Sequence, residues 1–339
     1  MHNKGLSMSS NSNLESHQTL MAAIRLLKAG GVVAFPTETV YGLGADAEND
    51  AAVRRIFSIK GRPVDHPLIV HLADSSFIDR WAQDVPDAAL RLAERFCPGP
   101  LTIILRRSRR VSDLVTGGLD TVGLRVPAHP VAQVLLSEFG GGIAAPSANR
   151  YGRISPTHAE HVREELGTAP DMILDGGNCQ IGLESTIISL VDDRPILLRP
   201  GGISHTELCE VLGREVAHPT QADHALRAPG CHASHYAPVT PARVVSKAII
   251  PAEIKRLSTG GQRVALLCMS NIDHESCHVA ECMHMPGDPA GYGRALYASL
   301  RRVDAAGLDL ILVEAPPDSE PWRAVRDRLQ RASCHRALV

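Results

Sequence analysis

Polar side chains crowd the segment Pro36-Thr37-Glu38-Thr39-Val40-Tyr41-Gly42-Leu43, directly after the apolar run 32–35. A short apolar run of this kind predicts a buried strand, and loops at strand ends often hold binding groups on a rigid scaffold. Thr37 and Tyr41 are therefore candidates for contacts with a small molecule. A Thr-rich turn that serves only local structure would show the same pattern.

Two cations flank a glycine in the turn Lys60-Gly61-Arg62-Pro63. The backbone before a proline favours an extended form, and residues two apart in an extended chain project to the same face. Lys60 and Arg62 on one face would suit a polyphosphate, with arginine as a planar fork and lysine as a point charge. A solvated surface turn is the alternative.

Two further arginines interrupt or end apolar runs. Arg125 lies within the run 121–126, and Arg199 ends the run 195–199. A buried guanidinium is costly unless it meets an anion. That anion could be an internal Asp or Glu, or a carboxylate or phosphate of a ligand.

Side chains that form hydrogen bonds follow other expected strands. Ser147 and Asn149 come two residues apart after the Gly140-Gly141-Gly142 turn, and Ser185 enters a strand expected over 185–191. His71 ends a strand expected over 67–72, so we place it at a strand edge, where a lone histidine is more often structural than catalytic.

These segments stand in the order and approximate spacing of the motifs of the YrdC-like family, which the chain resembles closely over about residues 17–215. The segment 229–238, which contains His235-Tyr236, resembles the linker of the long, two-domain threonylcarbamoyl-AMP synthases. One departure is that family linkers tend to carry basic residues just before the His-Tyr pair, whereas residues 231–234 are Cys-His-Ala-Ser. Contacts from those side chains to phosphate are therefore in doubt.

The resemblance implies a nucleotidyltransferase that condenses L-threonine, bicarbonate and ATP to threonylcarbamoyl-AMP and pyrophosphate, for threonylcarbamoyladenosine modification of tRNA. It implies Lys60 and Arg62 as the catalytic cations. It also implies threonine binding by Thr37, Tyr41, His71, Arg125 and Ser185, and ATP binding by Lys60, Arg62, Ser147, Asn149, Arg199 and Tyr236.

Cofactor and partners follow from the same resemblance. Mg²⁺ is expected with ATP, held mainly by phosphates and water, so no dedicated metal site is predicted. The expected partners are the three small-molecule substrates, the tRNA threonylcarbamoyl transferase complex that would receive the product, and tRNA itself as a direct contact that stays open. Tyr236 is expected to close over ATP and exclude water.

The sequence predicts an α/β protein in two domains. Residues 1–16 are expected as a disordered tail, 17–215 as a catalytic domain with a YrdC-like twisted mixed sheet, 216–240 as a linker and active-site lid, and 241–339 as a smaller Rossmann-like domain. Strands are expected at 32–35, 67–72, 101–106, 121–126, 142–145, 172–175, 185–191, 195–199, 242–245, 263–268 and 308–314. Helices are expected at 18–28, 51–59, 88–96, 204–213, 290–306 and 322–332.

The second domain carries weaker signals. Its first expected strand is followed by no Gly-x-Gly-x-x-Gly motif, which argues against dinucleotide binding. Its resemblance to the family is weak beyond the segment 327–332, so a regulatory, structural or partner-docking role stays open. Cys277-His278, Cys282 and His284 are zinc ligand types, but without a second Cys-x-x-Cys half we interpret them as a surface loop.

Composition agrees with an enzyme of the cytoplasm. The 339 residues carry a net charge of −2, which argues against a permanently basic nucleic-acid-binding surface. We find neither an apolar run of the roughly 18 residues that would cross a bilayer nor a secretory signal, and the eight scattered cysteines fit reduced thiols. No membrane partner is expected.

Other classes of function stay open. The run 106–110 holds four arginines that could touch RNA phosphates, which would suit a tRNA or double-stranded RNA binding module. A solvated strand end explains the same run. A hydrogenase-type carbamoyl-transfer module would need acylphosphatase-like and zinc-finger-like segments that we do not find, and a passive scaffold would not need six polar segments.

Overall fold

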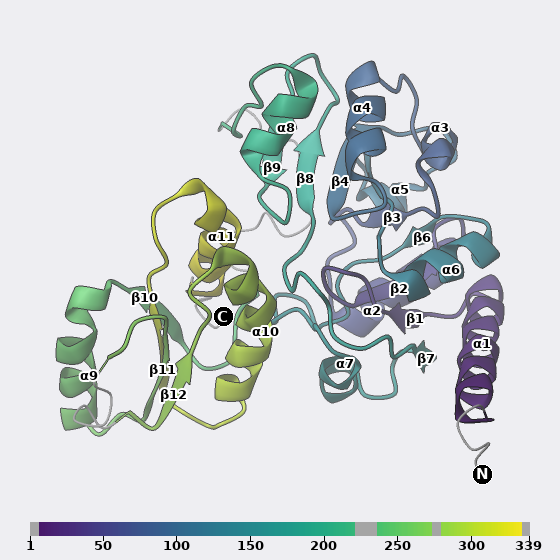
Figure 1. The fold of residues 1–339 in the computed structure, drawn as a ribbon. Helices are drawn as coiled ribbons and strands as arrows, with labels where there is room; N and C mark the ends of the chain where they lie inside the picture. Colours follow the sequence, from purple (N-terminus) through teal and green to yellow (C-terminus); the bar gives the residue numbers. More distant parts are fainter. Residues whose placement is uncertain (1–6, 221–235, 273–278, 334–339) are drawn as a thin grey trace, which may run out of the picture.

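The computed structural model describes residues 7–220, 236–272 and 279–333, with side chains from His17 onward (Figure 1). The expected linker and lid therefore lie partly outside the described residues, as do His235, Cys277 and His278. Two sheets form the frame, one in each domain. No described helix is long and apolar enough to cross a membrane.

The first domain is built on a nine-stranded twisted sheet in the order β7-β1-β2-β6-β3-β5-β4-β8-β9. Its strands pair both in parallel, as β3 with β5, and antiparallel, as β4 with β5, so the expected mixed sheet is confirmed. The strands are β1 (Val33–Phe35), β2 (Gly42–Asp46), β3 (Ile69–His71), β4 (Leu101–Arg106), β5 (Thr121–Arg125), β6 (Ile143–Ala144), β7 (Met172–Ile173), β8 (Thr186–Ser189) and β9 (Ile196–Arg199).

Helices cover this sheet. They are α1 (Ser7–Lys28), α2 (Asp50–Lys60), α3 (Ile78–Trp81), α4 (Asp87–Phe96), α5 (Asp113–Thr116), α6 (Pro130–Phe139), α7 (Ala159–Leu166) and α8 (His205–Leu212). The sequence analysis missed α3, α5, α6, α7 and strand β2. All eight strands expected in this domain are present, most of them shorter by a residue or more at their ends.

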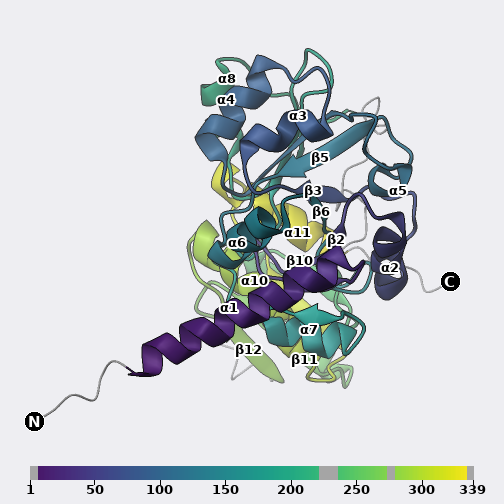
Figure 2. The ribbon, with the colours of Figure 1, turned by 90° about the vertical axis from the view of Figure 1, so that its right-hand side faces the viewer.

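Helix α1 corrects the expectation of a disordered tail over residues 7–16, and residues 1–6 of that tail lie outside the described part of the chain. The helix begins at Ser7, eleven residues before the expected start at Gln18, and its N-terminal end extends beyond the body of the protein (Figure 2). Its C-terminal part packs Ala23, Ile24 and Leu27 against α6. Helix propagation adds one hydrogen bond per residue once a turn is formed, so a helix nucleated on this apolar face can continue through a polar stretch.

The second domain is a parallel sheet between two layers of helices, as expected of a small Rossmann-like unit. The strand order is β10-β13-β11-β12. Its elements are β10 (Ala242–Val245), α9 (Ile250–Thr259), β11 (Val264–Cys268), β12 (Glu281–His284), α10 (Pro289–Asp304), β13 (Leu310–Glu314) and α11 (Arg323–Ser333). Figure 1 shows α9 on one face of the sheet and α10 and α11 on the other.

Side chains along β11 alternate between the two faces of the second sheet, and both faces are covered by helices. Val264, Leu266 and Cys268 pack in the cluster that contains the apolar side of α9, whereas Ala265 and Leu267 pack with α10 and α11. Successive side chains of a strand point to opposite faces, so a continuous apolar run fits a strand that is covered twice. The expected surface loop is wrong for Cys282 and His284, because both lie on β12.

The two domains share one hydrophobic cluster. Val40, Ile154 and Leu183 of the first domain pack in it with Leu296 and Tyr297 of α10. The backbone approaches closely there: a Cβ on residue 182, a glycine with φ +79, would lie 2.6 Å from the Cα of an α10 residue. Side chains of the second domain therefore reach the loops that end the strands of the first.

Candidate functional site

A pocket lies where the loops after β1 and β6, the ends of β3, β5 and β9, and the residues just before β8 converge. It brings together eight of the eleven predicted site residues: Thr37, Arg62, His71, Arg125, Ser147, Ser185, Arg199 and Tyr236. Val40, Gly42, Ile69, Ala145, Pro146 and Glu184 complete the lining. Lys60, Tyr41 and Asn149 are predicted site residues that the structure places behind this lining.

The loop after β1 is fixed by the Thr37 hydroxyl. It donates to the Val40 carbonyl over 2.6 Å and accepts from the Val40 amide at 3.2 Å and the Thr39 amide at 3.2 Å. Thr37 therefore holds the turn that it belongs to, as a local capping residue would, and also faces the pocket.

Arg125 pairs with an internal carboxylate, one of the two kinds of anion expected for a buried arginine. Its Nη2 lies 2.7 Å from Oε1 of Glu38, and both side chains are less than one-tenth exposed. Oε2 of Glu38 accepts a hydrogen bond from the Ala128 amide at 3.1 Å. The Nε of Arg125 has no hydrogen-bond partner among the described residues. The ion pair thus holds the guanidinium in place, and Arg125 is one of the residues that line the pocket.

His71 lies beside Arg125 in the register of β3 and β5. The expected place at the end of a strand is confirmed, since His71 is the last residue of β3, which lies between β6 and β5 in the sheet. Burial, and next the Arg125 guanidinium, lower the pKa of the imidazole to about 3. His71 is therefore neutral at physiological pH, and a neutral ring can contact a substrate without adding charge.

Lys60 and Arg62 do not share one face of an extended chain, as the sequence had suggested. Lys60 is the last residue of α2, and Gly61 follows in the left-handed region at φ 61 as the helix cap. Nη2 of Arg62 donates to the Pro67 carbonyl over 2.8 Å, and its Nε has no partner among the described residues. Arg62 alone of the two cations lines the pocket.

The ammonium of Lys60 binds backbone instead. It donates to the Ser147 carbonyl over 2.6 Å and to the Asn149 carbonyl. Burial, and next the neighbouring Arg62, hold the pKa of Lys60 well below its ordinary value. Lys60 therefore fixes the loop that presents Ser147 to the pocket.

Asn149 and Tyr41 also support the wall from behind. The Asn149 amide donates to the carbonyls of Arg150 and Arg153, at 2.8 and 2.9 Å. The Tyr41 hydroxyl donates to the Gly177 carbonyl over 2.8 Å, and burial raises the pKa of this phenol to about 12. A direct contact of Tyr41 or Asn149 with a ligand stays a prediction.

Ser185 and Arg199 face each other at the ends of the antiparallel strands β8 and β9. Nε and Nη2 of Arg199 donate to the Ser185 carbonyl over 3.0 and 2.9 Å, and Nη2 also contacts the Ser185 hydroxyl at 3.1 Å. That hydroxyl lies 2.8 Å from the hydroxyl of Thr102 on β4. The cation is thereby anchored on backbone at the pocket wall.

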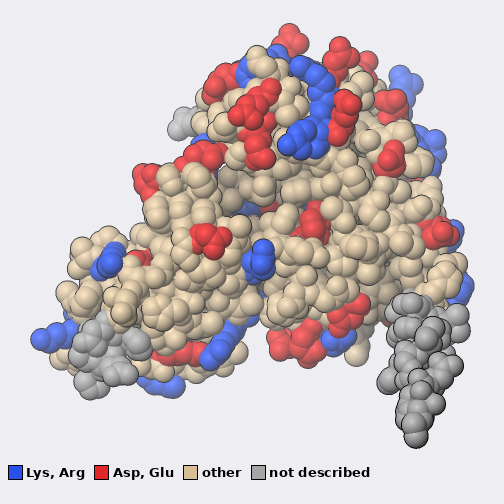
Figure 3. All heavy atoms as spheres, in the orientation of Figure 1, with Lys and Arg blue, Asp and Glu red and all other residues tan. Residues whose placement is uncertain are grey.

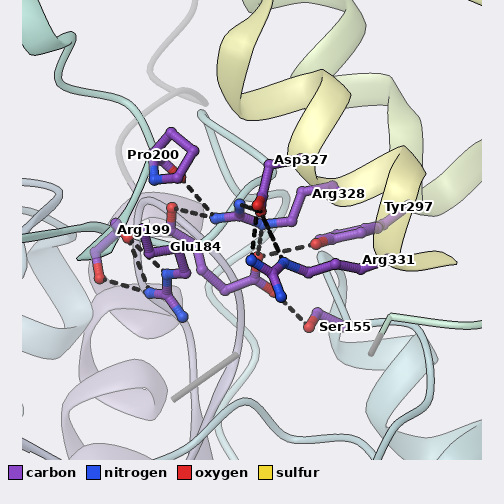
Figure 4. A network of polar contacts seen from close by, with 9 residues as sticks. Ser155, Glu184, Arg199, Pro200, Tyr297, Asp327, Arg328 and Arg331 are labelled. Carbon is purple, nitrogen blue, oxygen red and sulfur yellow. Dashed lines mark hydrogen bonds and ion pairs between the residues drawn. The ribbon is translucent and has the colours of Figure 1, made fainter. Parts of the chain in front are cut away.

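Glu184 and its partners from the second domain were missed by the sequence analysis. Its Oε1 accepts from Ser155 over 2.6 Å, and its Oε2 accepts from Tyr297 at 2.9 Å and from Nε of Arg328 at 2.8 Å (Figure 4). Burial by itself would raise the pKa of Glu184. The guanidinium groups of Arg328 and Arg199, together with these hydrogen bonds, outweigh burial and lower that pKa. Glu184 directly precedes the predicted site residue Ser185, but nothing in the sequence pairs it with an arginine 144 residues away.

Comparison with known proteins agrees with the geometry. Residues 25–201 match the family model described as "Telomere recombination", and residues 203–334 match that of the threonylcarbamoyl-AMP synthase C-terminal domain. The threonylcarbamoyl-AMP synthase of Pyrococcus abyssi is 40% identical over 93% of this chain and 94% of its own length. The chain belongs to the threonylcarbamoyl-AMP synthase family.

A further relative and a solved structure cover the same length. The threonylcarbamoyl-AMP synthase of Bacillus subtilis is 41% identical over 93% of both chains. The solved structure of P. abyssi Sua5 in complex with L-threonine superposes with a TM-score of 0.86, at 40% identity over 93% of this chain and 94% of that one. Members of this family are enzymes, and both domains of this chain have counterparts in them.

Proposed function

We infer that this protein condenses L-threonine, bicarbonate and ATP to threonylcarbamoyl-AMP and pyrophosphate. The observation that carries the inference is the convergence of Arg62, Arg125 and Arg199 on one pocket, in a chain of this family. Three fixed guanidinium groups suit a reaction in which a carboxylate, a carbamate and a triphosphate have to meet.

The chemistry accounts for these residue types. The amine of threonine attacks the carbon of bicarbonate, and loss of water gives a carbamate. A carbamate oxygen then attacks the α-phosphorus of ATP, and the bond to the β-phosphate oxygen breaks to release pyrophosphate. No covalent intermediate on the protein is needed, so most of the catalysis comes from positioning and charge stabilisation.

We place threonine at the Arg125 end of the pocket. Arg125 would bind the substrate carboxylate with the donors that Glu38 leaves available, beside the hydroxyl of Thr37 and the neutral ring of His71. Ser185 is the further hydroxyl within the same lining. Val40, Ile69 and Ala145 supply apolar surface that could receive the threonine methyl group.

We place ATP at the end formed by Arg62, Ser147, Arg199 and Tyr236. Lys60 would act through the loop that it holds, and Arg62 would contact the phosphates directly. Tyr236 is fully buried and would shield the nucleotide from water.

Magnesium would enter with ATP as part of the substrate. Glu184 and Glu38, the carboxylates at the pocket, already accept hydrogen bonds from Arg328, Tyr297 and Arg125. Because both carboxylates are already paired, we propose that the ion would be held by phosphate oxygens and water.

The partners and location follow as part of the proposal. We propose that the product passes to the tRNA threonylcarbamoyl transferase complex, and that the enzyme works in the cytoplasm, where its five described cysteines would remain free thiols. Direct tRNA binding through the run 106–110 has less support, because Arg106, Arg107 and Arg110 pair with Asp or Glu carboxylates. On the face shown in Figure 3, basic and acidic side chains are interspersed.

Pyrophosphate release tests the function. The purified protein is incubated with ATP and Mg²⁺, with and without L-threonine and with and without bicarbonate. We expect pyrophosphate only when both are present, and its loss in Arg62→Met and Arg199→Met. Arg302→Met serves as a control, because Arg302 is exposed on α10 and pairs with Glu281. Pyrophosphate release that does not depend on L-threonine would refute the proposal.

A further inference from the structure

Arg328 on α11 is the most deeply buried cation of the second domain among the described residues, with no exposed surface. It belongs to the segment 327–332, in which the sequence of this domain most resembles the family. The synthase chemistry outlined above gives it no role. A guanidinium without water must satisfy its donors on protein groups, so its partners show what it holds.

Those partners lie on the wall of the pocket in the first domain. Nε of Arg328 donates to the Glu184 carboxylate over 2.8 Å, and Nη2 donates to the Pro200 carbonyl over 3.0 Å. Glu184 directly precedes Ser185, and Pro200 directly follows Arg199. One planar group therefore joins the strand ends that carry the predicted Ser185 and Arg199 contacts (Figure 4).

The same guanidinium lies over Tyr236. Its central carbon is 5.3 Å from the centre of the tyrosine ring, which is within the range of a cation–π contact. Tyr297 of α10 lies against the same ring, with centroids 5.8 Å apart, and donates its hydroxyl to Glu184. Two residues of the second domain thus hold both Glu184 and Tyr236.

Asp327 orients the arginine from its own helix. Its carboxylate lies 2.5 Å from Nη1 of Arg328 and 2.8 Å from Nη2 of Arg331, one turn further along α11. Every nitrogen of the Arg328 fork therefore has an oxygen partner: Nε and Nη2 reach across to the first domain, and Nη1 stays on α11. A lysine ammonium could not span these partners in one plane.

We propose that Arg328 is a positioning residue of the synthase, through which the C-terminal domain sets the nucleotide end of the pocket. It fixes Glu184, the Arg199-Pro200 strand end and Tyr236 as one unit. This role rests on the proposed function, because it concerns the wall against which ATP would bind.

The test separates positioning from folding. Arg328→Met alone leaves the Glu184 carboxylate buried without its cation, so loss of activity could reflect unfolding. Glu184→Gln removes that charge, and the double variant Glu184→Gln/Arg328→Met is compared with it. The readout is the equilibrium Kd for ATP, measured by calorimetry without threonine, together with the urea midpoint of unfolding.

We expect Glu184→Gln and the double variant Glu184→Gln/Arg328→Met to unfold at similar urea concentrations. The double variant should bind ATP at least tenfold more weakly than Glu184→Gln. Arg328→Lys should also fold and should also lose ATP affinity, since it keeps a cation but not the fork. Arg326→Met is the matched control on the same helix, because Arg326 is partly exposed and pairs with Asp318. Its Kd should match that of the wild type.

Equal Kd values for Glu184→Gln and the double variant would overturn the role of Arg328 and leave the proposed function intact. Wild-type affinity in Arg328→Lys would overturn the role of the planar fork in the same way. A wild-type protein that binds no ATP would refute the proposed function and, with it, this inference.

Discussion

The buried pair of Glu38 and Arg125 offers the sharpest prediction, because it separates the stability of the pocket from its function. Glu38→Gln leaves the Arg125 guanidinium buried without a counter-ion. Removing one partner of a buried ion pair costs about 3–5 kcal/mol. For a domain of this size, about 2–4 °C of melting temperature corresponds to each kcal/mol, so the melting temperature should fall by roughly 6–20 °C.

The double variant Glu38→Met/Arg125→Met should recover most of that loss. Apolar residues of similar volume often replace a buried ion pair at little or no cost in stability. Yet the double variant lacks the guanidinium that we place against the threonine carboxylate. Urea unfolding should therefore show near-native stability, while calorimetry with L-threonine should show no binding.

An exposed pair provides the control. Arg302 on α10 lies 2.8 Å from Glu281 on β12, with an arginine side chain 70% exposed. Removing either partner there should change the free energy of unfolding by less than about 1 kcal/mol. Two results would refute the reasoning: a double variant at Glu38 and Arg125 that is as unstable as Glu38→Gln, or one that still binds threonine with wild-type affinity.

Three further predictions concern His71, Lys60 and the arginine run 106–110. The pKa of His71 in the fold, about 3, lies below that of the unfolded chain, so its contribution to stability is present above pH 6.5 and is lost as the pH falls toward 3. Between pH 7 and 5.5, wild type should lose about 1 kcal/mol more unfolding free energy in urea than His71→Gln, and equal losses would contradict this. Lys60→Met should weaken ATP binding at least tenfold in calorimetry, because the Ser147 loop loses its anchor; an unchanged Kd would argue against that anchor. Replacing Arg106 and Arg110 by Gln should leave RNA mobility in a gel-shift assay unchanged, whereas a salt-sensitive shift lost in this variant would revive the RNA-binding alternative.

The sequence by itself determined most strands of the first domain and most of the residues that line its pocket. Largely apolar runs such as 101–106 and 121–126 predict strands because strands covered on both faces are mostly apolar. Arginines inside or at the end of such runs, Arg125 and Arg199, needed polar partners, which in the structure are Glu38 for Arg125 and Ser185 for Arg199. Both conclusions depend on neighbouring residues and on solvation alone, so they need no tertiary structure.

Strand β2 shows where local reasoning fails. Gly42–Asp46 contains two glycines and an alanine, which have little preference for strands. Pairing with β1 on one side and β6 on the other overrides that preference. A Cβ on Gly44 would lie 2.6 Å from the ring of Phe35 and 2.7 Å from Ile143, so the small residue is a requirement of packing.

Only the tertiary structure decided which charges meet. Glu38 and Arg125 are 87 residues apart, and Glu184 and Arg328 are 144 apart in different domains. It also placed Arg62 in the pocket and Lys60 behind it, although the two are separated by one glycine. A sequence shows that a buried charge needs a partner, but the partner is set by the packing of distant elements, which desolvates both groups and brings them into contact.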